Sequence, residues 1–235
     1  MAEIHILIVP NLRNSYEKTA MMIKNSFYDM IFLNLPRNLQ SLISKYYYGK
    51  INFNEFIEKL KILLPEPKNT WIYLFEPILK IINEISAEIY CYLENFEEIL
   101  ENSIEITILT LKANITGKIK LEEWLKIIKP LSLNSSIEFI AYKAKGKCLC
   151  ISNLFGWKIA HKIKKYGHEV YLKCIESFYR LKPLETLTLL LEKSKINPEI
   201  AEYLIKEHIK FINEYVLKSN NLDEAYLLWS YRFRK

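Results

Sequence analysis

The stretch EIHILIVPNLRNSYEKTAMMIKNSFYDMIFLNLP, residues 3–36, reads as a strand, a helix and a second strand. Its first apolar run, residues 4–9, is rich in Ile and Val at successive positions, which is typical of a central parallel strand covered on both faces. Pro10 ends this run, and Asn14 or Ser15 is placed to cap a helix that continues to about residue 26. The run DMIFLNLP then predicts a second strand that stops at Pro36.

The same alternation of strands and helices continues along the chain. Further strands are expected at 70–76, 87–94, 148–152 and 168–175. Helices are expected at 37–48, 53–64, 78–85, 96–113, 119–129 and 155–167. Strands that alternate with helices predict an α/β fold, with a mostly parallel, Rossmann-like sheet and helices on its faces.

Residues 181–235 read as helices only, with proline at helix starts and apolar residues three and four apart. We therefore divide the chain into an α/β domain, residues 1–180, and a C-terminal helical segment, residues 181–235. Because both faces of a parallel sheet need a cover, we expect this segment to pack on the α/β domain. The alternative is that the C-terminal helices pair with a second copy or with another protein of a complex.

The composition is that of an ordinary globular protein, with 50% hydrophobic and 26% charged residues among 235. No uncharged apolar run reaches about 18 residues, so we expect no membrane partner. The start MAEIHILIVP lacks the features of a secretory signal, and a cytoplasmic location is expected. The four cysteines include no C-x-x-C pair and are expected to be core thiols; Cys148 and Cys150, on one face of a strand, would bind a metal only with further ligands.

The common nucleotide-binding and hydrolase motifs are absent from the sequence. Neither G-x-x-x-x-G-K-[ST] nor G-x-G-x-x-G occurs, and there is no G-x-S-x-G or H-E-x-x-H. His161 and His168 suit solvated or structural positions, and His5 suits a strand interior. We therefore expect no cofactor, no metal and no catalytic residue of a recognised kind.

Polar residues gather at the expected carboxyl ends of the strands, where open parallel sheets hold their ligands. Asparagine and arginine there would bind an anion, whereas Glu76 and Glu94 could bind a metal or act as acid and base. The structural alternative is that Glu76 belongs to a helix start before Pro77 and that Glu94, with Asn95, caps the next helix. We name the following residues the strand-end rim: Asn11, Arg13, Asn34, Arg37, Glu76, Glu94 and Asn153.

Positive charge is concentrated between residues 141 and 182, where ten Lys or Arg face only Glu169 and Glu176. The lysines of such a segment would contact the phosphate groups of a nucleic acid, and its aromatic residues could stack on unpaired bases. The alternative is a solvated lysine surface without a ligand. The candidate nucleic-acid-binding residues are Lys143, Lys145, Lys147, Trp157, Lys158, Lys162 and Lys165.

Three blocks of the chain resemble the TraB/Tiki group, which includes the erythromycin-esterase-like and ChaN-like α/β proteins. YDMIFLNLPRNLQSLI, from residue 28, is similar to the family's second strand, D-x-V-x-x-E-L-P followed by Arg, with Asp29, Leu35, Pro36 and Arg37 in place. PILKIINEISAEIYCYLEN is similar to a later helix and strand. KGKCLCISNLFGWKIAHKIKKYGHEVYLK resembles the late strand, loop and helix.

The resemblance implies a TraB-like scaffold whose active-site motifs are missing. In the family the first strand ends in G-x-x-H, the second carries a Glu, and the late block carries a second G-x-x-H. This chain has VPNLRN, Asn34 and SNLFGW at those places. An asparagine cannot replace a carboxylate as a general base, so the resemblance implies a pseudoenzyme.

Three hypotheses follow for the function. The first is a non-catalytic α/β binding or assembly protein on a TraB-like scaffold. The second is a nucleic-acid-associated accessory protein, for instance in an archaeal antiviral defence or processing complex, that uses residues 141–182. The third is an enzyme whose strand-end site is built from Glu76, Glu94, His5 and Arg37.

Overall fold

The computed structural model describes residues 1–64, 69–94, 96–128, 132–193 and 196–233. These residues form two compact units, and each is described by itself. Met1–Glu94 with Leu133–Ser177 make an α/β unit, and Asn95–Ser132 with Phe178–Lys235 make a helical unit. The predicted helical segment 181–235 thus belongs to a unit that also includes residues 95–132.

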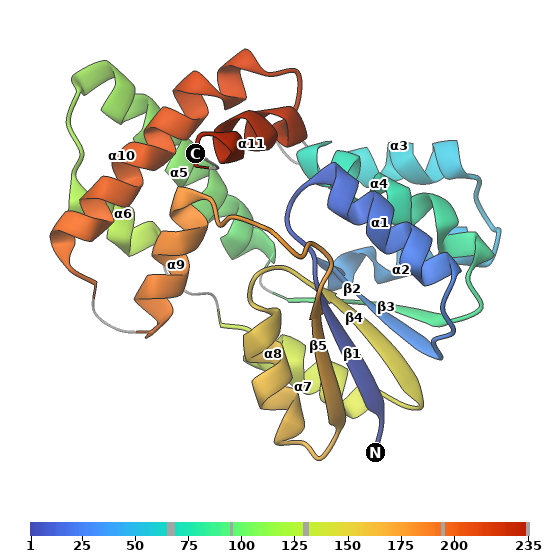
Figure 1. Ribbon diagram of the computed structural model, residues 1–235. Coiled ribbons are helices and arrows are strands. Elements are labelled where there is room, and N and C mark those ends of the chain that lie inside the picture. Colours follow the sequence, from blue (N-terminus) through green and yellow to red (C-terminus); the bar gives the residue numbers. More distant parts are fainter. Residues whose placement is uncertain (65–68, 95, 129–131, 194–195, 234–235) are drawn as a thin grey trace. The chain divides into compact units, whose positions relative to one another are not determined.

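The α/β unit contains a five-stranded, all-parallel sheet, which confirms the predicted fold class (Figure 1). The strands are β1 (Glu3–Ile8), β2 (Met30–Pro36), β3 (Glu88–Leu93), β4 (Lys147–Ser152) and β5 (Glu169–Cys174). The helices are α1 (Arg13–Lys24), η1 (Arg37–Leu39), α2 (Gln40–Tyr47), α3 (Phe53–Leu63), α4 (Asn69–Ile81), η2 (Ile82–Glu84), α7 (Asn134–Lys143) and α8 (Gly156–Lys164).

The strand order is β3-β2-β4-β1-β5, so the chain moves from β1 toward one edge and later returns to β4 and the other edge. β1 pairs with β4 from Glu3 opposite Lys147 to Ile8 opposite Ser152, and its other side pairs with β5. The connection after β1 leads toward β2 and β3, whereas the connection after β4 leads the opposite way to β5, so these two adjacent strands form a topological switch point of the sheet.

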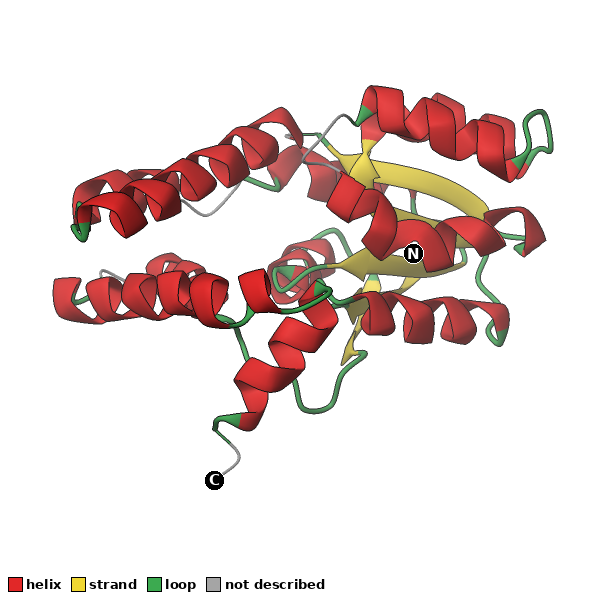
Figure 2. Cartoon of the chain, turned by 90° about the horizontal axis from the view of Figure 1, so that it is seen from above, coloured by secondary structure: helices red, strands yellow, loops and turns green. Residues whose placement is uncertain are grey.

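Helices cover both faces of the sheet, as Figure 2 shows from above. The helix α1 packs against α4 on one face, and α7 and α8 lie together on the other (Figure 1). The strands β1, β2 and β4 are almost wholly buried, whereas the edge strand β5 is mostly exposed. The buried Ile and Leu residues of the three inner strands form the core of this unit.

The predicted strand at 70–76 is wrong, because these residues lie in the helix α4. The predicted helix start at Pro77 is also wrong, since α4 begins at Asn69 and continues through Pro77 to Ile81. The buried side chains Ile72, Phe75 and Leu79 recur at helical spacing across the proline. Contact with α1, including a Tyr16–Phe75 ring pair with centroids 4.6 Å apart, outweighs the strand propensity of the aromatic run.

The starts of α3 and α1 differ in their capping. Asn52 caps α3, as its side-chain oxygen accepts a hydrogen bond from the backbone N–H of Glu55 at 2.9 Å. The predicted cap of α1 by Asn14 or Ser15 is wrong: the helix begins at Arg13, and Leu12 stands at the capping position without a side-chain bond.

The helical unit consists of α5 (Phe96–Thr116), α6 (Leu121–Ile127), α9 (Pro183–Lys193), α10 (Pro198–Glu214), η3 (Val216–Lys218) and α11 (Leu222–Tyr231). Its core is built around Trp124 of α6, with Leu109 of α5, Leu187 of α9, and Ala201 and Ile205 of α10. Residues separated by about ninety positions meet here, so neither helical stretch forms this core alone.

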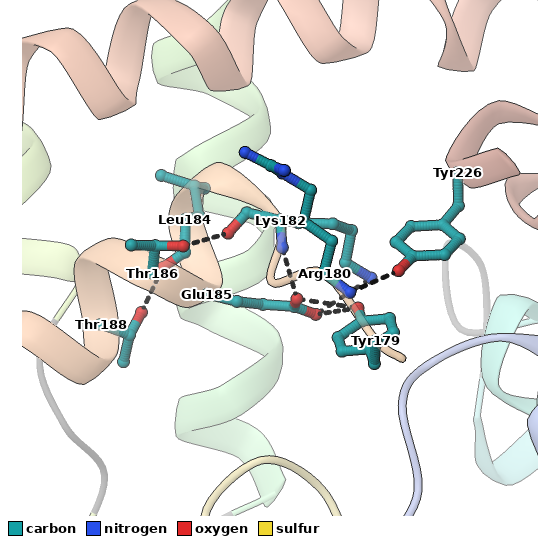
Figure 3. A network of polar contacts seen from close by, with 8 residues as sticks. All are labelled: Tyr179, Arg180, Lys182, Leu184, Glu185, Thr186, Thr188 and Tyr226. Carbon is teal, nitrogen blue, oxygen red and sulfur yellow. Dashed lines mark hydrogen bonds and ion pairs between the residues drawn. The ribbon is translucent and has the colours of Figure 1, made fainter. Parts of the chain in front are cut away.

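A polar network orders the start of α9 in this unit (Figure 3). The Glu185 carboxylate accepts hydrogen bonds from the Tyr179 hydroxyl and from the backbone N–H of Lys182, the latter at 2.8 Å. The Lys182 ammonium pairs with the same carboxylate at 3.0 Å, and the Tyr226 hydroxyl accepts the backbone N–H of Arg180. The bond from the Lys182 N–H to Glu185 satisfies a backbone donor that the start of a helix leaves unpaired, and the other bonds hold the segment before α9 in place.

Candidate ligand-binding surface of the α/β unit

The carboxyl ends of the parallel strands bring most of the strand-end rim to one edge of the sheet. Asn11 and Arg13 follow β1, Arg37 follows β2, Glu94 follows β3 and Asn153 follows β4. Asn34 lies within β2, where the pairing with β3 shifts register, and is buried. The loops after β1 and β4 flank the topological switch point of the sheet.

Glu76 is not a strand-end residue, contrary to the prediction, because it lies in α4. Its carboxylate pairs with Arg13 at 2.8 Å and with Lys80 at 3.0 Å. Burial alone would raise the pKa of Glu76, but the two cations outweigh it and hold the pKa below the usual value of a Glu. A carboxylate paired in this way is a weak base.

Arg37 connects the ends of β2 and β3 with α7. Its guanidinium pairs with Glu94, donates to the backbone carbonyl of Ser135 at 3.2 Å, and lies 4.0 Å from the centre of the Phe139 ring. The Glu94 carboxylate is therefore neutralised by Arg37. Residue 95 lies outside the described residues, so the predicted cap of Glu94 with Asn95 does too.

The asparagine after β4 has a structural role. The side-chain oxygen of Asn153 accepts the backbone N–H of Phe155 at 3.0 Å, and its carbonyl accepts the N–H of Gly156. These bonds form the turn from which α8 starts. Asn153 thus positions the helix that carries the candidate lysines.

A groove of about 550 Å³ opens between the edge strand β3 and α7. It brings together two groups that the sequence had placed separately: Arg37 and Glu94 of the rim, and Lys143 and Lys145 of the basic segment. Its aromatic residues, Tyr90 of β3 with Phe139 and Tyr142 of α7, were not predicted as site residues, although Phe139 and Tyr142 stand close to Lys143 in the sequence. The lining residues are Met30, Arg37, Glu88, Tyr90, Glu94, Ser135, Glu138, Phe139, Tyr142, Lys143 and Lys145.

The charges of this groove nearly balance. Glu88, Glu94 and Glu138 oppose Arg37, Lys143 and Lys145. The Glu88 carboxylate accepts the Tyr90 hydroxyl at 2.6 Å, and this hydrogen bond, with burial, raises the pKa of Tyr90 to about 12. The groove interior therefore gives no net attraction for an anion.

The outer face of α8 has a clear excess of positive charge. Its inner face is buried through Ile159, Ala160 and Ile163, so Lys158, Lys162 and Lys165, at helical spacing, lie on the outer face. No Asp or Glu occurs between residues 153 and 168. Trp157 at the start of the helix and Tyr166 after its end are both exposed.

Two tyrosines join the groove to the lysines of α8. Tyr142 of α7 lines the groove and Tyr166 follows α8, and their rings meet edge to face with centroids 6.0 Å apart. The Lys162 ammonium also donates a hydrogen bond to the Asn134 side chain at the start of α7. We name Tyr142, Lys143, Lys145, Lys158, Lys162, Lys165 and Tyr166 the α7–α8 surface.

Lys147 is separate from that surface. It begins β4 at the amino edge of the sheet, 3.8 Å from the Glu3 carboxylate and 5.8 Å from the centre of the Tyr28 ring. At the same edge, Asp29 accepts the backbone N–H of Lys147 at 2.7 Å and closes over Gly146. Asp29 thus ties the start of β2 to β4.

The structure does not bring His5 to the strand-end rim. Its Nε2 atom lies 2.6 Å from the Glu3 carboxylate and its Nδ1 atom 3.4 Å from the Tyr28 hydroxyl. Both partners belong to the amino half of the sheet, whereas Glu94 and Arg37 lie at its carboxyl edge. His5, Glu76 and Glu94 therefore do not form the single site that the enzyme hypothesis requires.

The cysteines only partly follow their prediction. Cys91, Cys148 and Cys150 are buried, and burial raises the pKa of the Cys148 thiol to about 11, but Cys174 is exposed on the edge strand. Within the described ranges, no three His, Cys, Asp or Glu residues stand together so as to hold a metal ion. The described helices include none with the length and apolar character needed to cross a membrane.

Comparison of the chain with protein-family models, with curated proteins and with solved structures found no match.

Proposed function

We propose that this chain is a non-catalytic binding protein whose ligand is the phosphate backbone of a nucleic acid. One observation carries the proposal: the α7–α8 surface combines lysines on two adjoining elements with two exposed tyrosines between them. Among the described residues, Lys162, Lys164 and Lys165 have no carboxylate partner. A cation without an internal counter-ion is available to a phosphate.

Lysine ammonium groups act as point charges on flexible stems, so they contact a phosphate backbone without reading its sequence. Aromatic rings beside them stack on unpaired bases, because every base offers a flat face. The surface therefore favours single-stranded nucleic acid with little sequence preference. Binding by this surface needs no phosphate-binding loop.

The non-catalytic part of the proposal rests on the state of the carboxylates. Glu76 is held by Arg13 and Lys80, and Glu94 by Arg37, so neither carboxylate is placed to accept a proton from a substrate. We propose further that the chain has kept a TraB-like scaffold. Two positions where that family carries motif residues, Asn34 and Asn153, lie at or next to the strand ends of one sheet.

The test is binding of the full chain to labelled single- and double-stranded DNA and RNA at two salt concentrations. We expect the affinity to fall as salt rises, with single strands bound more tightly. The triple variant Lys158→Ala, Lys162→Ala, Lys165→Ala should lose most binding, and the slope of log affinity against log salt should fall by about 0.7 to 0.9 for each phosphate contact removed.

The matched control is Lys45→Ala, Lys50→Ala, Lys61→Ala, which removes the same charge from exposed lysines elsewhere in the α/β unit. It should leave most of the affinity in place. Absence of binding at low salt, or equal losses in the two triple variants, would contradict the proposal.

A further inference from the structure

The helix α5 of the helical unit has apolar residues on two opposite faces. On one face, Ile106 and Leu109 pack in the core around Trp124, and Ala113 is buried. The other face exposes four large aliphatic side chains. Their exposed fractions are Ile104 39%, Ile108 44%, Leu111 55% and Ile115 84%. A helix that is apolar on both faces is usually covered on both.

The exposed residues are spaced four, three and four positions apart. This is the spacing of the a and d positions of a heptad, which form the seam between two packed helices. We name Ile104, Ile108, Leu111 and Ile115 the α5 seam. The 21 residues of α5 span about 31 Å at 1.5 Å per residue, so the seam is long enough for a helix of the same length.

The charges beside the seam indicate which helix fits it. The first half of α5 carries Glu97, Glu98, Glu101 and Glu105 without a basic residue, whereas Lys112, Lys118 and Lys120 occupy its second half and the turn that follows. Two such helices side by side in parallel would place acid against acid. In antiparallel orientation the acidic half of each meets the basic half of the other.

We propose that a second copy of this chain covers the α5 seam, with the two α5 helices antiparallel. Ile104 then packs against Ile115 of the second copy, and Ile108 against Leu111. In this register Glu105 and Lys112, which lie on the same side of the seam, face Lys112 and Glu105 of the second copy. Among the described residues of its own chain, neither has an ion-pair partner.

A groove of about 520 Å³ beside the seam broadens the surface that a second helix would cover. Ile108, Glu105 and Lys112 of α5 form one wall, and Glu123, Lys126 and Ile127 of α6 belong to the other. A single helix pair buries less than the roughly 800 Å² per partner of a standard interface, so we expect association in the micromolar range.

The first test is the mass of the full chain in solution, measured by sedimentation equilibrium from low micromolar to several hundred micromolar concentration. The weight-average mass should rise from 28.0 kDa toward twice that value. The variant Ile108→Ser, Leu111→Ser should stay monomeric with an unchanged circular dichroism spectrum, because both side chains are exposed. The control Ile200→Ser, Tyr203→Ser, which changes exposed residues of α10, should associate like the parent chain.

The second test uses charge to identify the orientation. Glu105→Lys and Lys112→Glu should each weaken self-association about tenfold, because each sets like charges opposite one another. A mixture of these two variants should form a heterodimer, since both contacts are then between opposite charges. A chain that stays monomeric at every concentration, association that survives Ile108→Ser with Leu111→Ser, or variants that do not complement each other would overturn the proposal.

Discussion

The guanidinium of Arg13 donates a hydrogen bond to the backbone carbonyl of Tyr73, at 2.6 Å. Pro77, four residues further along α4, has no N–H with which to bond that carbonyl. A side chain from α1 thus satisfies a helix carbonyl that the proline leaves without its internal donor. Arg13, predicted as a ligand-binding residue of the rim, thus has a structural role, because it links α1 to α4.

This relationship predicts coupling between Arg13 and Pro77. Arg13→Ala should lower the free energy of unfolding by about 1 to 2 kcal/mol, because the Tyr73 carbonyl and Glu76 lose a partner. In a Pro77→Ala background the helix supplies its own N–H, and the cost of Arg13→Ala should fall by about 1 kcal/mol. Urea unfolding of the four chains of this double-mutant cycle measures the difference, and equal costs in both backgrounds would contradict it.

Arg37→Lys should not behave as a conservative change. A lysine can pair with Glu94, but it cannot at the same time reach the Ser135 carbonyl and stack on Phe139 as a planar group does. Since the site is partly exposed, we expect a loss of roughly 1 kcal/mol in unfolding free energy. Lys45→Arg, at an exposed position, is the control and should change stability little. Full stability of Arg37→Lys in urea unfolding would show that the ion pair alone matters.

Removing the two rings of the α7–α8 surface should separate stacking from charge. Tyr142→Ala with Tyr166→Ala should reduce affinity for single-stranded nucleic acid by about 1 to 3 kcal/mol per base that stacks, while the salt slope stays unchanged. Fluorescence titrations at several salt concentrations measure both quantities. Tyr203→Ala, an exposed tyrosine of the helical unit, serves as the control. A changed salt slope would mean that the rings do not act by stacking.

Gly156→Ala should destabilise the α/β unit, because α8 approaches β1 closely at this residue. A methyl group at this position would stand 2.7 Å from Cγ1 of Ile8 and 3.2 Å from Cγ2 of Ile6. Crowding of this kind costs roughly 1 to 3 kcal/mol. Gly117→Ala, which has open space but a φ of +66°, measures the cost of backbone strain alone. We expect Gly156→Ala to shift the unfolding midpoint more than Gly117→Ala does. A shift that is equal or smaller would show that the contact between α8 and β1 can adjust to the added methyl group.

Stability of the helical unit should fall in mild acid because of His208. Burial and the nearby Lys182 lower the pKa of His208 to about 4, and its ring packs edge-on against Trp124. Between the ordinary pKa near 6.5 and about 4 the unfolded chain binds a proton that the folded chain does not, so stability decreases as pH falls through this window.

The change is up to about 3 kcal/mol and is fully developed only at the folded pKa. His208→Leu should flatten the curve of unfolding free energy against pH over that range. His161→Gln, at an exposed position of α8, should leave the curve unchanged. If the unfolding free energy of His208→Leu still depends on pH over this range, other groups cause the dependence.

The sequence predicted the α/β class because its signals are local. The nearly continuous apolar run of residues 4–9 reflects burial of both faces of β1, and Asn52 caps α3 through a bond to a residue three positions away. The basic face of α8 was equally visible, since the spacing of Lys158, Lys162 and Lys165 is fixed by the helix itself. The strand prediction for residues 70–76 was wrong because an aromatic run followed by a proline is also the pattern of a strand and its end.

Sequence alone thus determined the order of most strands and helices and the placement of the lysines on one helix face. Only the tertiary structure decided that residues 95–132 join the C-terminal helices, and that Arg13 and Arg37 bind groups 57 to 98 positions away. The reason is physical: periodicity and capping depend on neighbours in the chain. The pairing of distant charges and the choice between helix and strand for an apolar run depend on the surfaces that packing brings against them.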